Sequence, residues 1–163
     1  MKTRKPKRVL LEIGPGTSPV AQRYHGKTKI LLDSDLGVLE MLAFKHRKLP
    51  AGRKPLLVKA DAKRLPLRAS SVGRIEYRLM NSGPGDAENV AREAQRVLAN
   101  NGTVTISVGG NQREKIEKAF EKQGFKLVKA FAPSEEQRTA WETLSNLLGA
   151  EPLVIKFKKV KQT

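Results

Sequence analysis

The sequence contains no cysteine among its 163 residues. Disulfides, thiolate metal sites and a cysteine nucleophile are therefore excluded, and no metal centre is predicted. Aromatic residues make up only 5% of the chain, which weakens any surface that would bind nucleic acid mainly by base stacking. No apolar run approaches the length needed to cross a membrane, and the N-terminus leads into a strand rather than a signal-peptide core. We therefore expect a cytoplasmic protein with no membrane partner.

Acidic residues are scarce relative to basic ones. The chain has 32 Lys and Arg against 16 Asp and Glu, a formal net charge of +16. This excess favours a polyanionic partner, most often nucleic acid, over a lysine-rich surface that serves only solubility or thermal adaptation. Residues 1–8 carry five of these cations and are predicted to form a basic arm of a single domain spanning residues 1–163. The oligomeric state stays open, and a partner subunit is possible.

We predict that the chain is organised around residues 9–21, VLLEIGPGTSPVA. An apolar run broken only by Glu12 predicts a buried parallel strand, and Gly14 and Gly16 then form a tight turn. Ser18 can cap the helix that follows. A strand, a glycine turn and a helix N-terminus bring bare backbone close to a ligand beneath the positive end of a helix dipole.

Carboxylates follow the next two predicted strands. Asp33 ends the strand that begins at Lys29, at about the spacing that places a carboxylate on ribose hydroxyls in a βαβ nucleotide site. Asp35 can cap the next helix, which is the simpler explanation for an acid there. Asp61 follows a third strand, and an acid in that position is common in any loop.

Four segments, in this order, resemble the motifs of class I S-adenosylmethionine-dependent methyltransferases. They are LEIGPGTS from residue 11, DSDLGVLEML from residue 33, DAKRLPLRASSV from residue 61 and AREAQRVLANNGTVTISV from residue 91. The first segment departs from the family pattern because Ser18 stands where a third glycine is often found. The resemblance implies an α/β, three-layer, doubly wound and mostly parallel seven-stranded sheet, the Rossmann-like methyltransferase fold, with S-adenosylmethionine as cofactor.

The same resemblance implies a set of cofactor-binding residues, with Asp33 on the ribose and Asp61 on the adenine amino group. The full set is Glu12, Gly14, Pro15, Gly16, Asp33, Ser34, Asp61, Ala62 and Asn81. Asn81 is also the candidate for positioning the acceptor beside the transferred methyl group, because its side chain both donates and accepts. Equally, Asn81 closes a turn with the residues that follow it.

The remaining patterns predict the other elements of the sheet. The fourth strand, Arg74–Met80, carries Glu76 and Arg78 on one face. They are expected to pair with each other or with helix residues, unless Arg78 lies near the open carboxyl end of the sheet. The two histidines, His25 and His46, lie near predicted helix ends and are expected at the surface.

Further helices and strands follow from periodicity and turn residues. Helices are expected from Ser18 to Gly26, Leu36 to before Pro50, Ala87 to Ala99, Gln112 to Gln123 and Ser134 to Leu148. Strands are expected over Leu56–Ala60, Thr103–Val108, Phe125–Phe131 and Leu153–Val160, with a turn at residues 100–102.

The expected reaction is methyl transfer to an RNA acceptor. No N-P-P-Y or D-P-P-Y motif follows the fourth strand, which argues against amino-group methylation of bases, and the lack of cysteine excludes pyrimidine C5 methylation through a cysteine adduct. A ring nitrogen or a ribose hydroxyl remains as the RNA acceptor, and no catalytic base is predicted. The alternatives are a small-molecule methyltransferase and a non-catalytic binding protein with the same fold.

Overall fold

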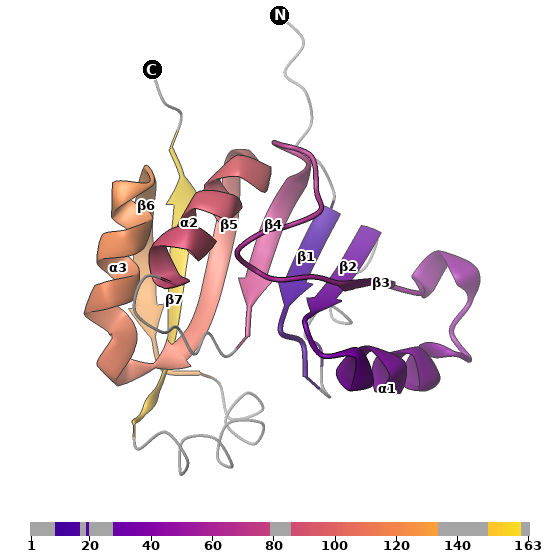
Figure 1. The fold of residues 1–163 in the computed structure, drawn as a ribbon. Helices are drawn as coiled ribbons and strands as arrows, with labels where there is room; N and C mark the ends of the chain where they lie inside the picture. Colours follow the sequence, from indigo (N-terminus) through magenta and orange to yellow (C-terminus); the bar gives the residue numbers. More distant parts are fainter. Residues whose placement is uncertain (1–8, 17–18, 20–27, 79–85, 134–149, 161–163) are drawn as a thin grey trace, which may run out of the picture.

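Seven strands form one sheet, in the order β3-β2-β1-β4-β5-β7-β6 (Figure 1). The structure, a computed structural model, describes residues 9–16, 19, 28–78, 86–133 and 150–160. The strands are β1 (Val9–Ile13), β2 (Thr28–Asp33), β3 (Leu56–Lys59), β4 (Val72–Tyr77), β5 (Leu98–Gly109), β6 (Phe125–Phe131) and β7 (Pro152–Lys159). The helices are α1 (Leu36–His46), α2 (Asp86–Val97) and α3 (Arg113–Lys122), with 3₁₀ turns η2 (Ala51–Arg53) and η3 (Gly110–Gln112).

The order of the strands places a ligand site at the carboxyl ends of β1 and β4. Strands β1 to β5 run parallel, whereas β7 is antiparallel to both of its neighbours, β5 and β6. From β1 the chain adds β2 and β3 on one side of the sheet. It then returns to place β4 on the other side of β1 and adds β5, β7 and β6 beyond it. Ile13 pairs with both Leu32 and Tyr77, so the three central strands end level with one another. Open α/β sheets bind ligands at such a switch point.

Alternating side chains of β1 supply two cores on opposite faces of the sheet. Leu11 and Ile13 join the main core, to which α2 and α3 contribute Ala91, Ala94, Ile116 and Phe120. Leu10 points the other way and packs with Leu31 and with Leu42 of α1. Burying each such aliphatic side chain contributes about 1.5–3 kcal/mol. The three-layer, doubly wound and mostly parallel arrangement predicted from the sequence is confirmed.

The predicted turn at residues 100–102 is a bulge inside β5. Leu98 pairs with Val72 of β4, and the next pair joins Thr103 to Arg74, so four residues of β5 bulge out between the two pairs. Asn101 has a φ of 63°, a conformation that asparagine tolerates better than most residues. The helices predicted over residues 18–26 and 134–148 and the basic arm lie outside the described residues. None of the helices that the structure describes is long and apolar enough to cross a membrane.

The expectation that His46 lies at the surface is wrong. Its side chain is buried, with 5% exposed, because it follows Leu42 by four residues and therefore shares the face of α1 that packs on the sheet. This burial lowers the pKa of His46 below its ordinary value, despite a hydrogen bond to the backbone of Leu42. His46 is thus a core residue, and His25 lies outside the described part of the chain.

Candidate functional site

A cavity of about 350 Å³ lies where the central parallel strands end. Its walls come from residues that end or follow β1, β2, β3 and β4 and from the first turns of α2. Five residues expected to bind a cofactor line it together: Gly14, Asp33, Ser34, Asp61 and Ala62. Segments up to 48 positions apart in the sequence therefore meet at one site, as parallel strands of one sheet require.

Three other expected residues are not part of the cavity lining. Glu12 is fully buried within β1, and Pro15 and Gly16 belong to the turn that follows Gly14. None of these three contributes to the lining of the cavity. Asn81, expected to position the acceptor, lies outside the described residues.

The two glycines of the turn have different roles. Both have positive φ, +65° at Gly14 and +54° at Gly16, which disfavours any residue with a Cβ. A Cβ on Gly14 would lie 2.7 Å from the carbonyl oxygen of Arg78, whereas a Cβ on Gly16 would meet no atom of the described residues within 4 Å. Gly14 is therefore required for β1 and β4 to approach each other, and Gly16 faces open space.

Asp33 is held in place by the chain that follows it. Its Oδ1 accepts a hydrogen bond of 3.0 Å from the backbone N–H of Asp35, and Asp35 in turn accepts from the N–H of Gly37 at 2.7 Å and caps α1. The predicted cap is confirmed. Because only Oδ1 of Asp33 makes this contact, the carboxylate has a fixed orientation and acceptor capacity left for a ligand.

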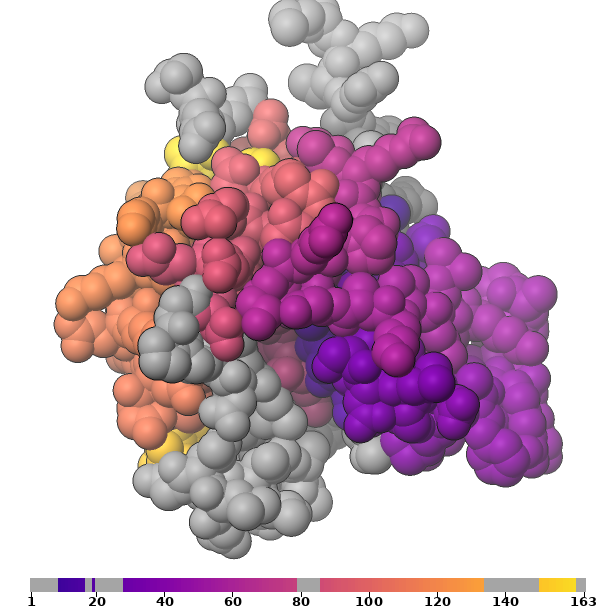
Figure 2. Space-filling view, in the orientation of Figure 1, coloured from indigo at the N-terminus to yellow at the C-terminus, as the bar shows by residue number. Residues whose placement is uncertain are grey.

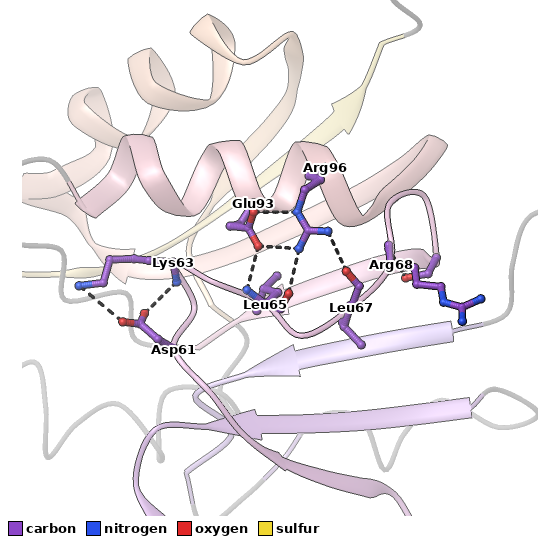
Figure 3. A network of polar contacts seen from close by, with 8 residues as sticks. Asp61, Lys63, Leu65, Leu67, Arg68, Glu93 and Arg96 are labelled. Carbon is purple, nitrogen blue, oxygen red and sulfur yellow. Dashed lines mark hydrogen bonds and ion pairs between the residues drawn. The ribbon is translucent and has the colours of Figure 1, made fainter.

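Asp61 is oriented in the same way and also takes part in a chain of charges. Its Oδ1 accepts from the N–H of Lys63 at 2.8 Å. The ammonium of Lys63 lies 3.7 Å from Asp61 (Figure 3). It also lies 3.4 Å from Asp86, the first residue of α2. All three side chains are more than a third exposed, so the pairs stabilise the fold little. Their effect is to place Lys63 between the two acids.

The loop that carries Asp61 runs at the surface beside α2 (Figure 2). Glu93 and Arg96 of α2 hold its backbone (Figure 3). Glu93 accepts from the N–H of Leu65 at 2.8 Å, and Arg96 donates to the carbonyls of Leu65 and Leu67 at 2.8 and 2.7 Å. These three contacts fix a loop that has no helix or strand of its own.

Tyr77 lines the cavity and was not predicted from the sequence. Tyr77 is fully buried at the end of β4, and within the described chain its hydroxyl has no hydrogen-bond partner. A tyrosine at an inward-facing strand position is indistinguishable in sequence from an ordinary core residue. Burial, with a smaller effect of the nearby Glu93 charge, raises the pKa of Tyr77 far above its ordinary value. The hydroxyl therefore stays protonated.

Arg78 lines the cavity at the carboxyl end of the sheet, which was one of the alternatives predicted for it from the sequence. Glu76 does not pair with it, because Glu76 forms its ion pair with Arg74 further back along β4. The Nε of Arg78 is buried, and no hydrogen-bond partner for it exists among the described residues. The cavity thus has two oriented carboxylates, Asp33 and Asp61, and a guanidinium, that of Arg78, whose Nε has no hydrogen-bond partner in the described part of the chain.

Comparison with solved structures relates this fold and cavity to known proteins. The chain matches no protein-family model and no curated protein sequence. It is similar to geranyl diphosphate C-methyltransferase from Streptomyces coelicolor A3(2), at 13% identity and a TM-score of 0.74 over 98% of this chain and 72% of the other.

Two further similarities extend over most of both chains. The 16S rRNA methyltransferase KamB has 19% identity and a TM-score of 0.71, covering 95% of this chain and 89% of its own. A putative methyltransferase from Bacillus halodurans C-125 has 16% identity and a TM-score of 0.70, covering 96% and 94%. The protein therefore has the Rossmann-like fold of class I S-adenosylmethionine-dependent methyltransferases, as its motifs implied.

Proposed function

We propose that the protein transfers a methyl group from S-adenosylmethionine to RNA. The observation that supports this most directly is the junction of the glycine turn with the oriented carboxylates Asp33 and Asp61 around one cavity. Its volume of about 350 Å³ falls within the range of small-molecule sites. Solved structures of the similar geranyl diphosphate methyltransferases include one in complex with this cofactor.

Each part of the cofactor has a candidate partner among the residues at this site. Asp33 would accept hydrogen bonds from the ribose hydroxyls, and Asp61 from the adenine amino group, with the backbone N–H of Ala62 facing the ring. The open space in front of Gly16 would admit the methionine end, and the guanidinium of Arg78 would pair with its carboxylate. The cofactor, when bound, supplies an electrophilic methyl group.

The protein's own contribution to the reaction is orientation. Holding two reactants in line converts a bimolecular step into an effectively unimolecular one, which lowers the barrier by about 7–11 kcal/mol in well-oriented systems. Tyr77 does not act as a base, because burial keeps its hydroxyl protonated. Asn81 remains our candidate for positioning the acceptor. A ring nitrogen or a ribose hydroxyl of RNA is the acceptor class that the sequence favours.

The preference for RNA rests on the net charge of +16 and on the similarity to an rRNA methyltransferase. The second candidate acceptor is a small molecule. The similarity to methyltransferases that act on geranyl diphosphate, a small molecule that is itself an anion, favours it. The two candidates share the cofactor site and differ in what binds at its mouth.

Calorimetry with S-adenosylmethionine tests the cofactor, and Asp33→Ala is expected to weaken binding by about 1–3 kcal/mol because the ribose hydroxyls lose their acceptor. The absence of heat and of a melting shift at millimolar cofactor would exclude the enzyme. Tritiated cofactor incubated separately with total RNA and with a small-metabolite extract tests the acceptor. Label in the metabolites alone would overturn the RNA proposal, and label in neither would favour a non-catalytic protein.

A further inference from the structure

Four lysines form a block on the face of the sheet opposite α3, at its β6–β7 edge. Lys126 lies directly across from Lys158, and Lys129 directly across from Lys156. Lys156 and Lys158 are two residues apart on β7, so all four share one face. The alternate residue of β7, Phe157, belongs to the main core with α3. We call Lys126, Lys129, Lys156 and Lys158 the lysine block.

The lysine block is dense in charge, and the two strands that carry it contain no acid. Adjacent strands lie about 4.8 Å apart, and alternate residues of one strand lie about 6.7 Å apart. The Cα atoms of the four lysines therefore mark out a patch of roughly these two dimensions. β6 and β7 together contain five lysines and no Asp or Glu. The fifth, Lys159, turns to the opposite face and donates to the carbonyls of Gln95 and Leu98. No ion pair with an acid joins the other four in the described part of the chain.

Protection of the sheet edge does not account for the lysine block. Lysines on an edge strand discourage pairing with other chains, which explains Lys126 and Lys129 on β6. However, β7 lies between β5 and β6, so Lys156 and Lys158 protect no edge. Like charges directly opposite each other on neighbouring strands are destabilising. Two such pairs side by side therefore indicate a bound anion rather than a merely soluble surface.

We propose that the lysine block binds phosphates of the RNA acceptor's backbone. The proposal rests on the proposed function, since it assigns a docking surface to that acceptor. Ammonium groups are compact point charges that suit phosphate and carry no base-specific geometry. Among the described residues, the ring that lies against the block is Phe131, whose centroid is 4.4 Å from the ammonium of Lys129. Backbone contact rather than stacking is thus the main source of affinity.

The position of the lysine block suits an extended acceptor. β6 is three strands from β4, at whose end Arg78 lines the cavity, and three strand spacings amount to about 14 Å. A strand of RNA held at the block would therefore still have to extend across β5 to present a nucleotide at the cavity. A small metabolite in the cavity would not span this distance, so the block distinguishes the two acceptor classes.

The test compares two charge-matched double variants of the full chain. Lys126→Gln with Lys158→Gln removes one cross-strand pair, and Lys48→Gln with Lys54→Gln removes two exposed lysines near the far end of α1. Binding of total RNA is measured by fluorescence anisotropy over a range of salt concentrations. The first variant is expected to reduce the log–log salt slope by about 1.4, at about 0.7 per phosphate contact, while the control leaves it unchanged. Calorimetry with S-adenosylmethionine confirms that both variants keep the cofactor site.

Each result decides the proposal. An equal loss of slope in both variants would show diffuse charge and overturn it, as would an unchanged slope in the first variant. Binding to anionic lipid vesicles is measured for the same variants. If the first variant lost vesicle binding and kept RNA binding, the block would be a lipid site and the proposal would be overturned. RNA binding through the block without methyl transfer would leave this inference standing and refute the proposed reaction. Methyl transfer to RNA at the same rate in the lysine-block variant and in the wild type would refute this inference and support the proposed reaction.

Discussion

Arg96 and Glu93 form a two-bonded ion pair on α2, with Nε to Oε1 at 2.8 Å and Nη2 to Oε2 at 2.7 Å. The same two side chains bond the backbone at Leu65 and Leu67, about 30 residues earlier in the chain. The pair therefore joins α2 to the loop that begins with Asp61. This contact gives a physical reason for the E-x-x-R spacing within AREAQRVL, because residues three apart on a helix lie side by side.

Arg96→Lys should loosen this loop. Lysine keeps the charge but lacks the planar fork that reaches both Glu93 and two carbonyls, so buried acceptors lose their donor. We expect the free energy of unfolding in urea to fall by about 1–3 kcal/mol, with weaker binding of S-adenosylmethionine. The neighbouring Arg92→Lys is the control, because exposed Arg92 makes a single 3.2 Å hydrogen bond to Asn89 within the described part of the chain. We call the contacts of Glu93 and Arg96 with the backbone at Leu65 and Leu67 the clamp. Equal losses of stability in both variants would show that the clamp does not hold the loop.

Glu93 should also make stability depend on acid pH. The hydrogen bond from Arg96 is the largest cause that holds the pKa of Glu93 below its ordinary value of 4.5. A carboxylate whose pKa is lower in the folded state stabilises fully above the unfolded value, and this contribution is lost as the pH falls through the folded value. Glu93→Gln should therefore lose less stability than the wild type between pH 6 and pH 3, as measured by urea midpoints. Parallel losses would assign acid sensitivity to other groups.

Local pattern was enough to predict the strands, the cap at Asp35 and five residues that meet at the cavity. Each of these depends on neighbours within a few positions, or on the rule that parallel strands end at one edge. The clamp was not predictable because Leu65 and Glu93 are 28 residues apart and nothing local marks them as partners. His46 was misplaced for a related reason, since proximity to a helix end says little about which face packs.

The two glycines of the turn should respond differently to alanine. Gly14→Ala places a Cβ 2.7 Å from the carbonyl of Arg78 in addition to the cost of positive φ, so we expect a loss of stability above about 2 kcal/mol. In Gly16→Ala the new Cβ meets no described atom, so we expect stability to fall only by the backbone cost of positive φ, about 1 kcal/mol. The same Cβ would occupy space that we expect the cofactor to need, so binding should weaken. Thermal melts and cofactor calorimetry separate the two effects. Equal cofactor affinity in Gly16→Ala and wild type would place the ligand elsewhere.

Lys159 should stabilise the end of α2 despite being a buried cation. Its ammonium donates to the carbonyls of Gln95 and Leu98 at 2.6 and 2.8 Å, while desolvation lowers its pKa. Lys159→Met keeps the apolar stem but leaves both carbonyls without this donor, so we expect a loss of about 1–3 kcal/mol in urea unfolding. Exposed Lys158→Met should change stability by less than about 0.5 kcal/mol. A stable Lys159→Met would mean that burial of the charge outweighs its hydrogen bonds.

Arg78→Met should weaken cofactor binding without harming the fold. The Nε of Arg78 has no partner within the described structure, so its removal leaves no donor or acceptor newly unpaired and the melting temperature should hold. If its guanidinium pairs with the cofactor carboxylate, affinity for S-adenosylmethionine should fall by about 1.5–3 kcal/mol, the range for a hydrogen bond to a charged group. Decarboxylated S-adenosylmethionine provides the control ligand, because it lacks the group that Arg78 would bind. Wild type and variant should bind it equally, and a loss of equal size for both ligands would show that Arg78 shapes the cavity rather than recognising the carboxylate.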